Sequence, residues 1–99
     1  MIDMGKIHGI EIAKDAVMEA WHNASEELDR LTKKSSELTT DYVNTPYDEK
    51  RKLDELEELI RVNHTAWAVS YGMAQMCSQL CTIFEDMIDD EFKSETEAV

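Results

Sequence analysis

The chain has 99 residues, and its 22 acidic and 10 basic side chains give a formal net charge of −12. A chain of this length forms at most one domain with a small core. Its negative charge argues against direct binding of nucleic acid, because contact with phosphates requires a basic surface. The same charge suits a partner protein with a basic surface, or serves solubility alone.

The N-terminal residues MIDMGKIHGI contain neither the basic region nor the apolar region of a secretory signal. We therefore expect a cytoplasmic protein in which Cys77 and Cys81 stay reduced and buried. No formally charged residue occurs from Val62 to Phe84, a stretch long enough to cross a bilayer. Polar side chains such as Asn63 and Gln79 make this stretch too polar for lipid, so we expect no membrane span.

Apolar residues recur every three or four positions along nearly the whole chain, which predicts an all-α fold. The only proline, Pro46, suits the first position of a helix, with Thr45 as the N-cap. We predict a single helical domain over residues 1–99. Its parts are a first helix over about 7–40, a loop over about 41–45, a second helix over about 46–92 and a frayed acidic tail over 93–99.

The two predicted helices carry matching apolar stripes with the spacing of a packed helical seam. In the first helix the stripe repeats every seven residues, at Ile10, Val17, Ala24, Leu31 and Leu38. In the second helix it alternates steps of three and four, at Leu53, Leu56, Ile60, Asn63, Trp67, Ser70, Ala74, Cys77, Cys81, Phe84 and Ile88. An antiparallel hairpin with Leu38 opposite Leu53 and Leu31 opposite Ile60 places Trp67 over Ala24, a large side chain over a small one.

A second apolar stripe on the second helix has no partner within the chain, because adjacent residues differ by about 100° around a helix. Its residues are Leu59, Val62, Ala66, Val69, Met73, Met76, Leu80, Ile83 and Met87. We expect a second copy of the hairpin to cover it, which gives a homodimeric four-helix bundle. The alternative is a three-helix monomer in which the second helix breaks near Gly72.

Glu19 and His22 form a Glu-x-x-His step of the kind that holds metal ions in carboxylate-bridged helical bundles. The chain has no second such step, and with Trp21 expected in the core, Glu19 and His22 point outward. No serine or cysteine has a histidine partner at a defining spacing, and there is no glycine-rich phosphate loop. We therefore expect no metal, no cofactor and no catalytic activity.

Carboxylates also occur in groups, with Glu26 beside Glu27, Glu57 beside Glu58, and Asp86 three positions before Asp89. In this respect the chain resembles the MazG-type all-α nucleotide pyrophosphatases, which hold Mg²⁺ against phosphates with paired acidic residues on two helices. The resemblance implies a Mg²⁺-dependent nucleotide pyrophosphatase as an alternative function. The chain departs from the family pattern because no glutamate lies three positions after Glu57 or Glu58, and because Asp86 stands where the family has glutamate.

Two surfaces are candidates for contact with a partner protein. One is an acidic cluster near the C-terminus, suited to a basic groove or serving only as a solubilising tail. The other is a polar, uncharged face of the second helix, where a solvated helix would normally carry Glu and Lys; contact with a partner or with another helix explains its lack of charge. The candidate contacts are His64, Tyr71, Gln75 and Gln79 on the uncharged face, and Asp86, Asp89, Asp90 and Glu91 in the acidic cluster.

These features favour a small acidic helical module that binds another protein through a polar or basic surface of that partner. Small, acidic, helical proteins without a chemical motif are common among phage and mobile-element products that inhibit host proteins, and by this analogy we expect an inhibitor. A structural or assembly-chaperone subunit is a further alternative.

Overall fold

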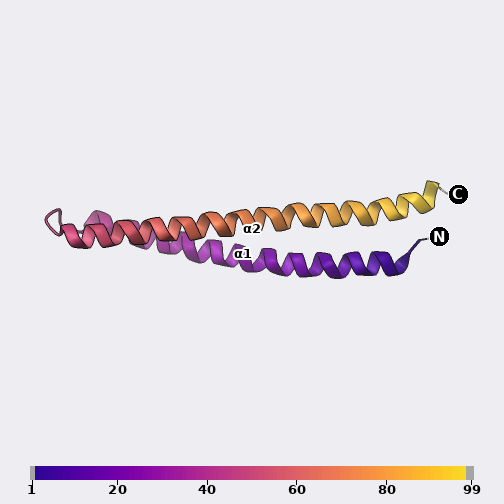
Figure 1. Ribbon diagram of the computed structural model, residues 1–99, viewed down its shortest axis with the longest axis horizontal. Helices are drawn as coiled ribbons and strands as arrows, with labels where there is room; N and C mark the ends of the chain where they lie inside the picture. Colours follow the sequence, from indigo (N-terminus) through magenta and orange to yellow (C-terminus); the bar gives the residue numbers. More distant parts are fainter. Residues whose placement is uncertain (1, 98–99) are drawn as a thin grey trace. The chain divides into compact units, whose positions relative to one another are not determined.

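The computed structural model describes residues 2–97, and for residues 94–97 it describes the backbone only. It contains two α-helices, α1 (Met4–Asn44) and α2 (Lys50–Glu97), and no strand within the described residues. Figure 1 shows the two helices and the short connection that joins them. The predicted all-α helical hairpin is therefore confirmed, while its dimerisation into a four-helix bundle stays a prediction.

Helix α1 begins several residues before the expected start because Asp3 caps it. The Asp3 carboxylate accepts a 2.9 Å hydrogen bond from the Lys6 main-chain nitrogen, and the Asp3 carbonyl accepts one of 3.1 Å from Ile7. An aspartate in this position satisfies a main-chain donor that the helix leaves unpaired.

Helix α2 begins at Lys50, four residues later than expected, because Pro46 starts a turn rather than a helix. The Glu49 nitrogen donates to the Pro46 carbonyl at 3.0 Å, and the first α-helical bond runs from Leu53 to the Glu49 carbonyl. The Thr45 hydroxyl, expected to cap α2, donates instead to the Asp41 carbonyl at the end of α1.

Helix α2 continues through Gly72 without a break, so the three-helix alternative is not adopted. No glycine in the described chain has a positive φ angle, and Gly72 is flanked by helix-forming residues such as Met73 and Ala74. The helix also continues beyond the expected end near residue 92 to Glu97, and Ala98 and Val99 lie outside the described residues.

Contacts between the helices fall into two units. The first, here called the terminal unit, contains the described residues up to 23 and from 73 onward. Its buried apolar residues are Ile7, Ile10 and Ala74. Two ion pairs join its helices, from Lys6 to Glu91 at 3.2 Å and from Lys14 to Glu85 at 2.9 Å. The start of α1 and the last part of α2 therefore lie in one unit.

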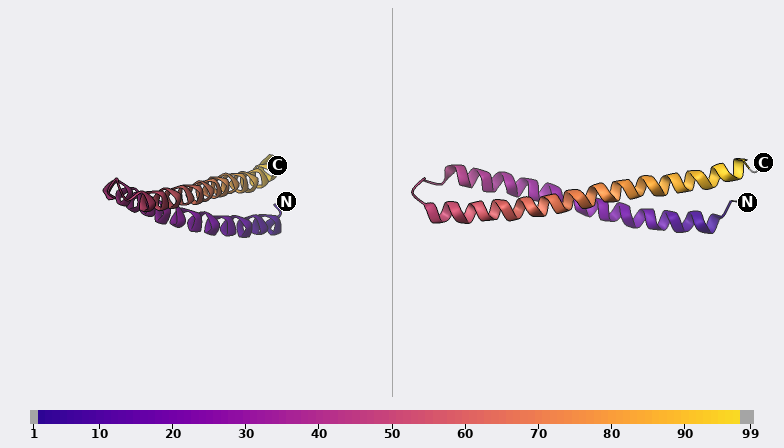
Figure 2. Two further views of the ribbon diagram at one scale, coloured as in Figure 1. Left: turned by 60° about the vertical axis from the view of Figure 1, so that its left-hand side comes forward. Right: turned by 45° about the horizontal axis from the view of Figure 1, so that its top comes forward.

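The second unit, here called the loop unit, contains residues 24–72. Both views in Figure 2 show its part of α1 running beside its part of α2, with the connection between them. Its buried residues are Ala24, Leu31, Leu38, Leu56 and the polar Asn63. All five lie on the seam stripes expected from the sequence.

The packing register of the loop unit differs from the prediction by about one helical turn. The Asn63 side chain donates a 3.0 Å hydrogen bond to the carbonyl of Leu31, the residue expected opposite Ile60. The Trp67 indole bonds to Thr32 instead of lying over Ala24. The connection occupies residues 45–49 instead of about 41–45, and this displacement along the chain moves every pair along the seam.

Trp21 is a second correction, because 44% of it is exposed, whereas the sequence placed it in the core. It borders a small groove in the terminal unit, of about 180 Å³, together with Met18, Ser78 and Cys81. The ion pair of Lys14 and Glu85 borders the same groove.

Candidate functional site

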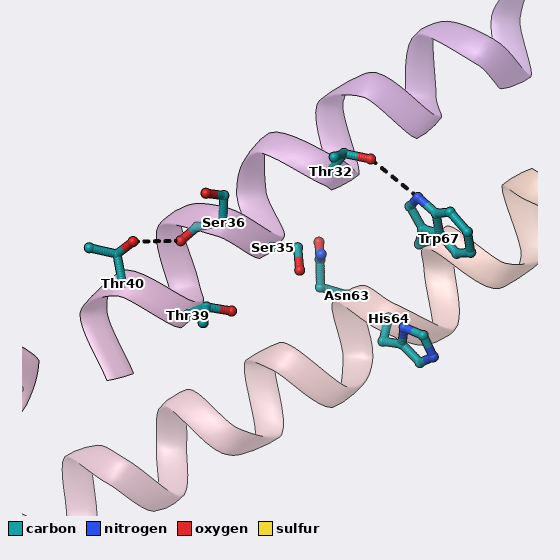
Figure 3. Close-up of a pocket in the computed structure, with 8 residues that line it drawn as sticks. All are labelled: Thr32, Ser35, Ser36, Thr39, Thr40, Asn63, His64 and Trp67. Carbon is teal, nitrogen blue, oxygen red and sulfur yellow. Dashed lines mark hydrogen bonds between the residues drawn. The ribbon is translucent and has the colours of Figure 1, made fainter. Parts of the chain in front are cut away.

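A groove lined by uncharged side chains lies in the loop unit and has a volume of about 540 Å³. Helix α1 contributes hydroxyl groups and α2 contributes an amide and two rings, as Figure 3 shows. The lining residues are Thr32, Ser35, Ser36, Thr39 and Thr40 of α1, and Asn63, His64 and Trp67 of α2. None of these side chains carries a formal charge when histidine is neutral.

The groove exists because both helices place a polar residue in the seam at this level. On α1 the seam position between Leu31 and Leu38 is occupied by Ser35, and on α2 the position between Ile60 and Trp67 is occupied by Asn63. Figure 3 shows Ser35 and Asn63 pointing into the space between the helices. A small serine in place of a leucine leaves room that an apolar seam would fill.

A chain of hydrogen bonds fixes Trp67 at one end of the groove. The indole nitrogen of Trp67 donates to the Thr32 hydroxyl at 3.2 Å, and that hydroxyl donates to the Leu28 carbonyl at 2.8 Å. Each bond polarises the next, so the pair is stronger than two isolated bonds. The ring is thereby held in one orientation.

Three rings stack in parallel along α2 beside the groove. The ring of Trp67 lies 6.3 Å from His64 with 6° between the planes, and 5.2 Å from Tyr71 with 8° between the planes. Steps of three and four residues bring these side chains to one helix face. We call His64, Trp67 and Tyr71 the aromatic ladder.

The ladder includes two of the residues expected to contact a partner. His64 and Tyr71 are exposed, and so are Gln75 and Gln79 further along α2. Trp67, which joins His64 to Tyr71, is half-buried. The sequence assigned Trp67 to the core and so missed its place between the other two rings.

The acidic cluster in the terminal unit is partly neutralised within the chain. Glu91 pairs with Lys6 and also accepts a 3.4 Å hydrogen bond from the Asp3 nitrogen, which leaves its side chain only 19% exposed. Asp86, Asp89 and Asp90 are exposed. Glu91 therefore ties the start of α1 to α2, and the three aspartates form the acidic surface that solvent reaches.

Hydrogen-bonded ion pairs shift the pKa of side chains on both helices. The hydrogen bond from Arg30 lowers the pKa of Glu27, and the hydrogen bond from Arg61 lowers the pKa of Glu58. In the terminal unit, the hydrogen bond to Glu85 raises the pKa of Lys14. None of these groups borders the polar groove.

The second apolar stripe of α2 is largely exposed in the single chain. Met76 is 63% exposed, Val69 60% and Met73 52%, and only Ala66 and Leu80 of the nine stripe residues are half-buried. The chain itself therefore does not cover the surface that the sequence assigned to a dimer interface.

The structure also bears on what the sequence predicted for the two cysteines, for metal binding and for a membrane span. Cys77 and Cys81 are free thiols, but both are half-buried rather than buried. Among the described residues, no three His, Cys, Asp or Glu side chains are placed to hold a metal ion. Neither helix, over the part that the structure describes, has an apolar segment long enough to cross a bilayer.

The hydroxyl residues of the groove were not selected from the sequence. The segment Thr32-Lys-Lys-Ser-Ser-Glu-Leu-Thr-Thr40 places five serines and threonines within nine residues of a helix, where these residue types are not favoured. That composition is the signal that would have identified the groove. No family model, curated protein or solved structure matches this chain.

Proposed function

We propose that this chain is a non-catalytic protein-binding module that contacts its partner through the aromatic ladder and the polar groove beside it. The ladder is the observation that carries the proposal. Stacked rings on an exposed helix face offer a large contact area at a small cost in side-chain entropy, which explains why Tyr and Trp are enriched in interfaces. Here the hydrogen bond from Trp67 to Thr32 reduces that cost further.

The chemistry of the surface indicates the kind of partner. Serine and threonine hydroxyls both donate and accept hydrogen bonds, so the groove suits polar, uncharged side chains such as amides and hydroxyls. The net charge of −12 favours approach of a protein with a basic surface. The partner is therefore a protein with a polar contact surface bordered by basic residues.

A pair of histidine substitutions tests this surface. His64→Glu places a charge on the ladder, and His8→Glu makes the same change at an exposed position on α1 that does not line the groove. After capture of partners from cells with the wild-type chain, we expect His64→Glu to weaken binding of a purified partner at least tenfold. His8→Glu should bind as the wild type does. Equal binding by both variants would overturn the proposed surface.

The proposal includes a homodimer, because seven of the nine residues of the second apolar stripe of α2 are exposed in the single chain. An interface of standard size covers roughly 800 Å² on each partner. The mass in solution tests the homodimer, and a monomer at micromolar concentration would exclude it.

The absence of catalysis is tested separately. Incubation of the purified protein with Mg²⁺ and a panel of nucleoside triphosphates should release no pyrophosphate above background. Release that follows protein concentration, and that is lost on Glu57→Gln with Glu58→Gln, would establish the pyrophosphatase alternative instead.

A further inference from the structure

Sulfur atoms from both helices meet at the small groove of the terminal unit. Met18 of α1 borders this groove of about 180 Å³ together with Cys81 of α2. Cys81 is a free, half-buried thiol, and so is Cys77 one helical turn before it. The groove therefore brings a thioether of one helix beside a thiol of the other, and all three residues belong to a single unit.

Cys77 is placed to act on the same ligand as Cys81. The two residues are four apart on α2, so their Cβ atoms lie about 5–6 Å apart. A disulfide requires about 3.5–4.5 Å between these atoms, so the pair does not form one while the helix is intact. Side chains of a helix lean toward its N-terminus, which places the Cys81 sulfur over the turn that carries Cys77. Two bonds through a shared cation span a longer gap than one sulfur–sulfur bond of about 2 Å.

The softness of these donors selects the kind of metal. Thiolate and thioether sulfur favour Cu(I), whereas Mg²⁺ and Ca²⁺ favour oxygen. A structural zinc site takes four ligands, and in the described part of the chain no third His, Cys, Asp or Glu joins the two cysteines. Glu85, the carboxylate that borders the groove, is paired with Lys14 at 2.9 Å. The donor set therefore suits a soft ion that is stable with few ligands.

Lys14 supplies a charge that balances such a complex. When two thiols bind Cu(I), both protons pass to solvent, and the complex keeps one net negative charge. The Lys14 ammonium group borders the groove, and its pKa is raised by the hydrogen bond to Glu85 and also by negative charge on Cys81. Lys14 therefore stays cationic and lies close enough to Cys81 to stabilise the complex.

We propose that the groove beside Trp21 binds one Cu(I) ion, held by the thiolates of Cys77 and Cys81 and by the thioether of Met18. The site goes beyond the proposed function, since it shares no residue with the aromatic ladder or the polar groove. It also departs from the expectation, drawn from the sequence, that the chain binds no metal. Trp21 and Ser78 are exposed at the border of the groove, so the ion reaches it from solvent.

Competition for Cu(I) with a coloured chelator tests the site, with the full chain reduced and kept free of oxygen. We expect the wild type to take up one Cu(I) ion per chain and to show the ultraviolet absorption of copper–thiolate bonds. Cys77→Ser and Cys81→Ser should each weaken binding at least a hundredfold, and Met18→Leu about tenfold, because each change removes a soft donor.

Met4→Leu is the matched control for Met18→Leu. Both methionines are exposed on α1 in the terminal unit, but Met4 does not border the groove. Met4→Leu should leave the affinity for Cu(I) unchanged. Thermal unfolding without copper checks that each variant is folded, and Met18→Leu keeps the test decisive because an exposed side chain is changed to one of similar size.

Three results would overturn the proposal. The first is equal affinity for Cu(I) in the wild type and Cys81→Ser, or equal affinity in Met4→Leu and Met18→Leu. The second is uptake of one ion for every two chains, which would place the site between copies. The third is binding of Zn²⁺ more tightly than Cu(I), which would exclude the chosen metal. Partner binding by the His64→Glu variant is measured independently, so either proposal can fail without the other.

Discussion

Asn63 of α2 donates a 3.0 Å hydrogen bond from its side-chain nitrogen to the main-chain carbonyl of Leu31 in α1. Only 6% of Asn63 is exposed, and it is the one polar residue among the buried residues of the described chain. A buried asparagine in an apolar seam favours a register in which its amide is hydrogen-bonded, because an unpaired buried amide is destabilising. The bond therefore stabilises the observed register of the loop unit.

The Leu31 bond predicts opposite effects for two substitutions of Asn63. Asn63→Asp places a carboxylate against a carbonyl oxygen in a buried position, so we expect a loss of roughly 3 kcal/mol in the free energy of unfolding at pH 7. The charged form is disfavoured in the folded state, which raises the folded-state pKa of the new carboxyl. The loss should therefore appear as pH rises through the unfolded value, about 3.9, and diminish below it.

Asn63→Leu is the contrasting variant. It replaces the amide with an apolar side chain of similar size, so thermal unfolding should show equal or greater stability, but the register should be less well defined. Urea unfolding at pH 3 and pH 7 measures the first effect, and amide exchange near Leu31 measures the second. If Asn63→Asp were as stable as the wild type at pH 7, the amide would have no such role.

The sequence predicted the seam residues but not their pairing, for a physical reason. Leu31, Leu38 and Leu56 are buried as their heptad spacing indicates. A heptad stripe, however, matches its partner almost equally well after a shift of one turn, so the spacing alone does not choose the register. The choice depends on the Pro46 turn and on Asn63, and neither contributes to the apolar pattern.

The candidate site shows the same limit. The lack of charge on one face of α2 was enough to select His64 and Tyr71, which are exposed. It could not place Trp67 between them, because the same residue also fits the seam stripe. Only the hydrogen bond to Thr32 decides which way the ring turns.

The bond between Trp67 and Thr32 predicts an energetic coupling of the two residues. Trp67→Phe keeps a ring in the ladder but removes the donor, and Thr32→Val removes the acceptor while keeping the shape. We expect each change to lower the free energy of unfolding by about 1 kcal/mol, and the double variant to lose less than the sum. Urea unfolding of the four proteins measures the coupling, and strictly additive losses would mean that the bond contributes nothing.

The cap at Asp3 predicts a difference between two variants at the start of α1. Asp3→Ala removes the acceptor for the Lys6 nitrogen, so we expect a loss of about 1 kcal/mol. Asp3→Asn keeps an oxygen at the same place and should lose much less. Thermal unfolding compares the two, and equal losses would show that the charge beside Lys6, rather than the cap, is what stabilises the helix.

The ion pair of Lys14 and Glu85 predicts a pH dependence confined to alkaline solution. The hydrogen bond to Glu85 raises the folded-state pKa of Lys14 above its ordinary value of about 10.4. A raised lysine pKa means that the pair's contribution to stability is complete below that ordinary value and is lost as pH rises through the folded-state pKa.

A double-mutant cycle isolates this contribution, because the titration of other groups cancels in it. The cycle compares the unfolding of the wild type, Lys14→Gln, Glu85→Gln and the double variant at pH 8 and above pH 11. We expect a small coupling at pH 8, since both side chains reach solvent, and none at the higher pH. A coupling that persists above pH 11 would mean that packing around the groove beside Trp21, and not the charge on Lys14, joins these two residues.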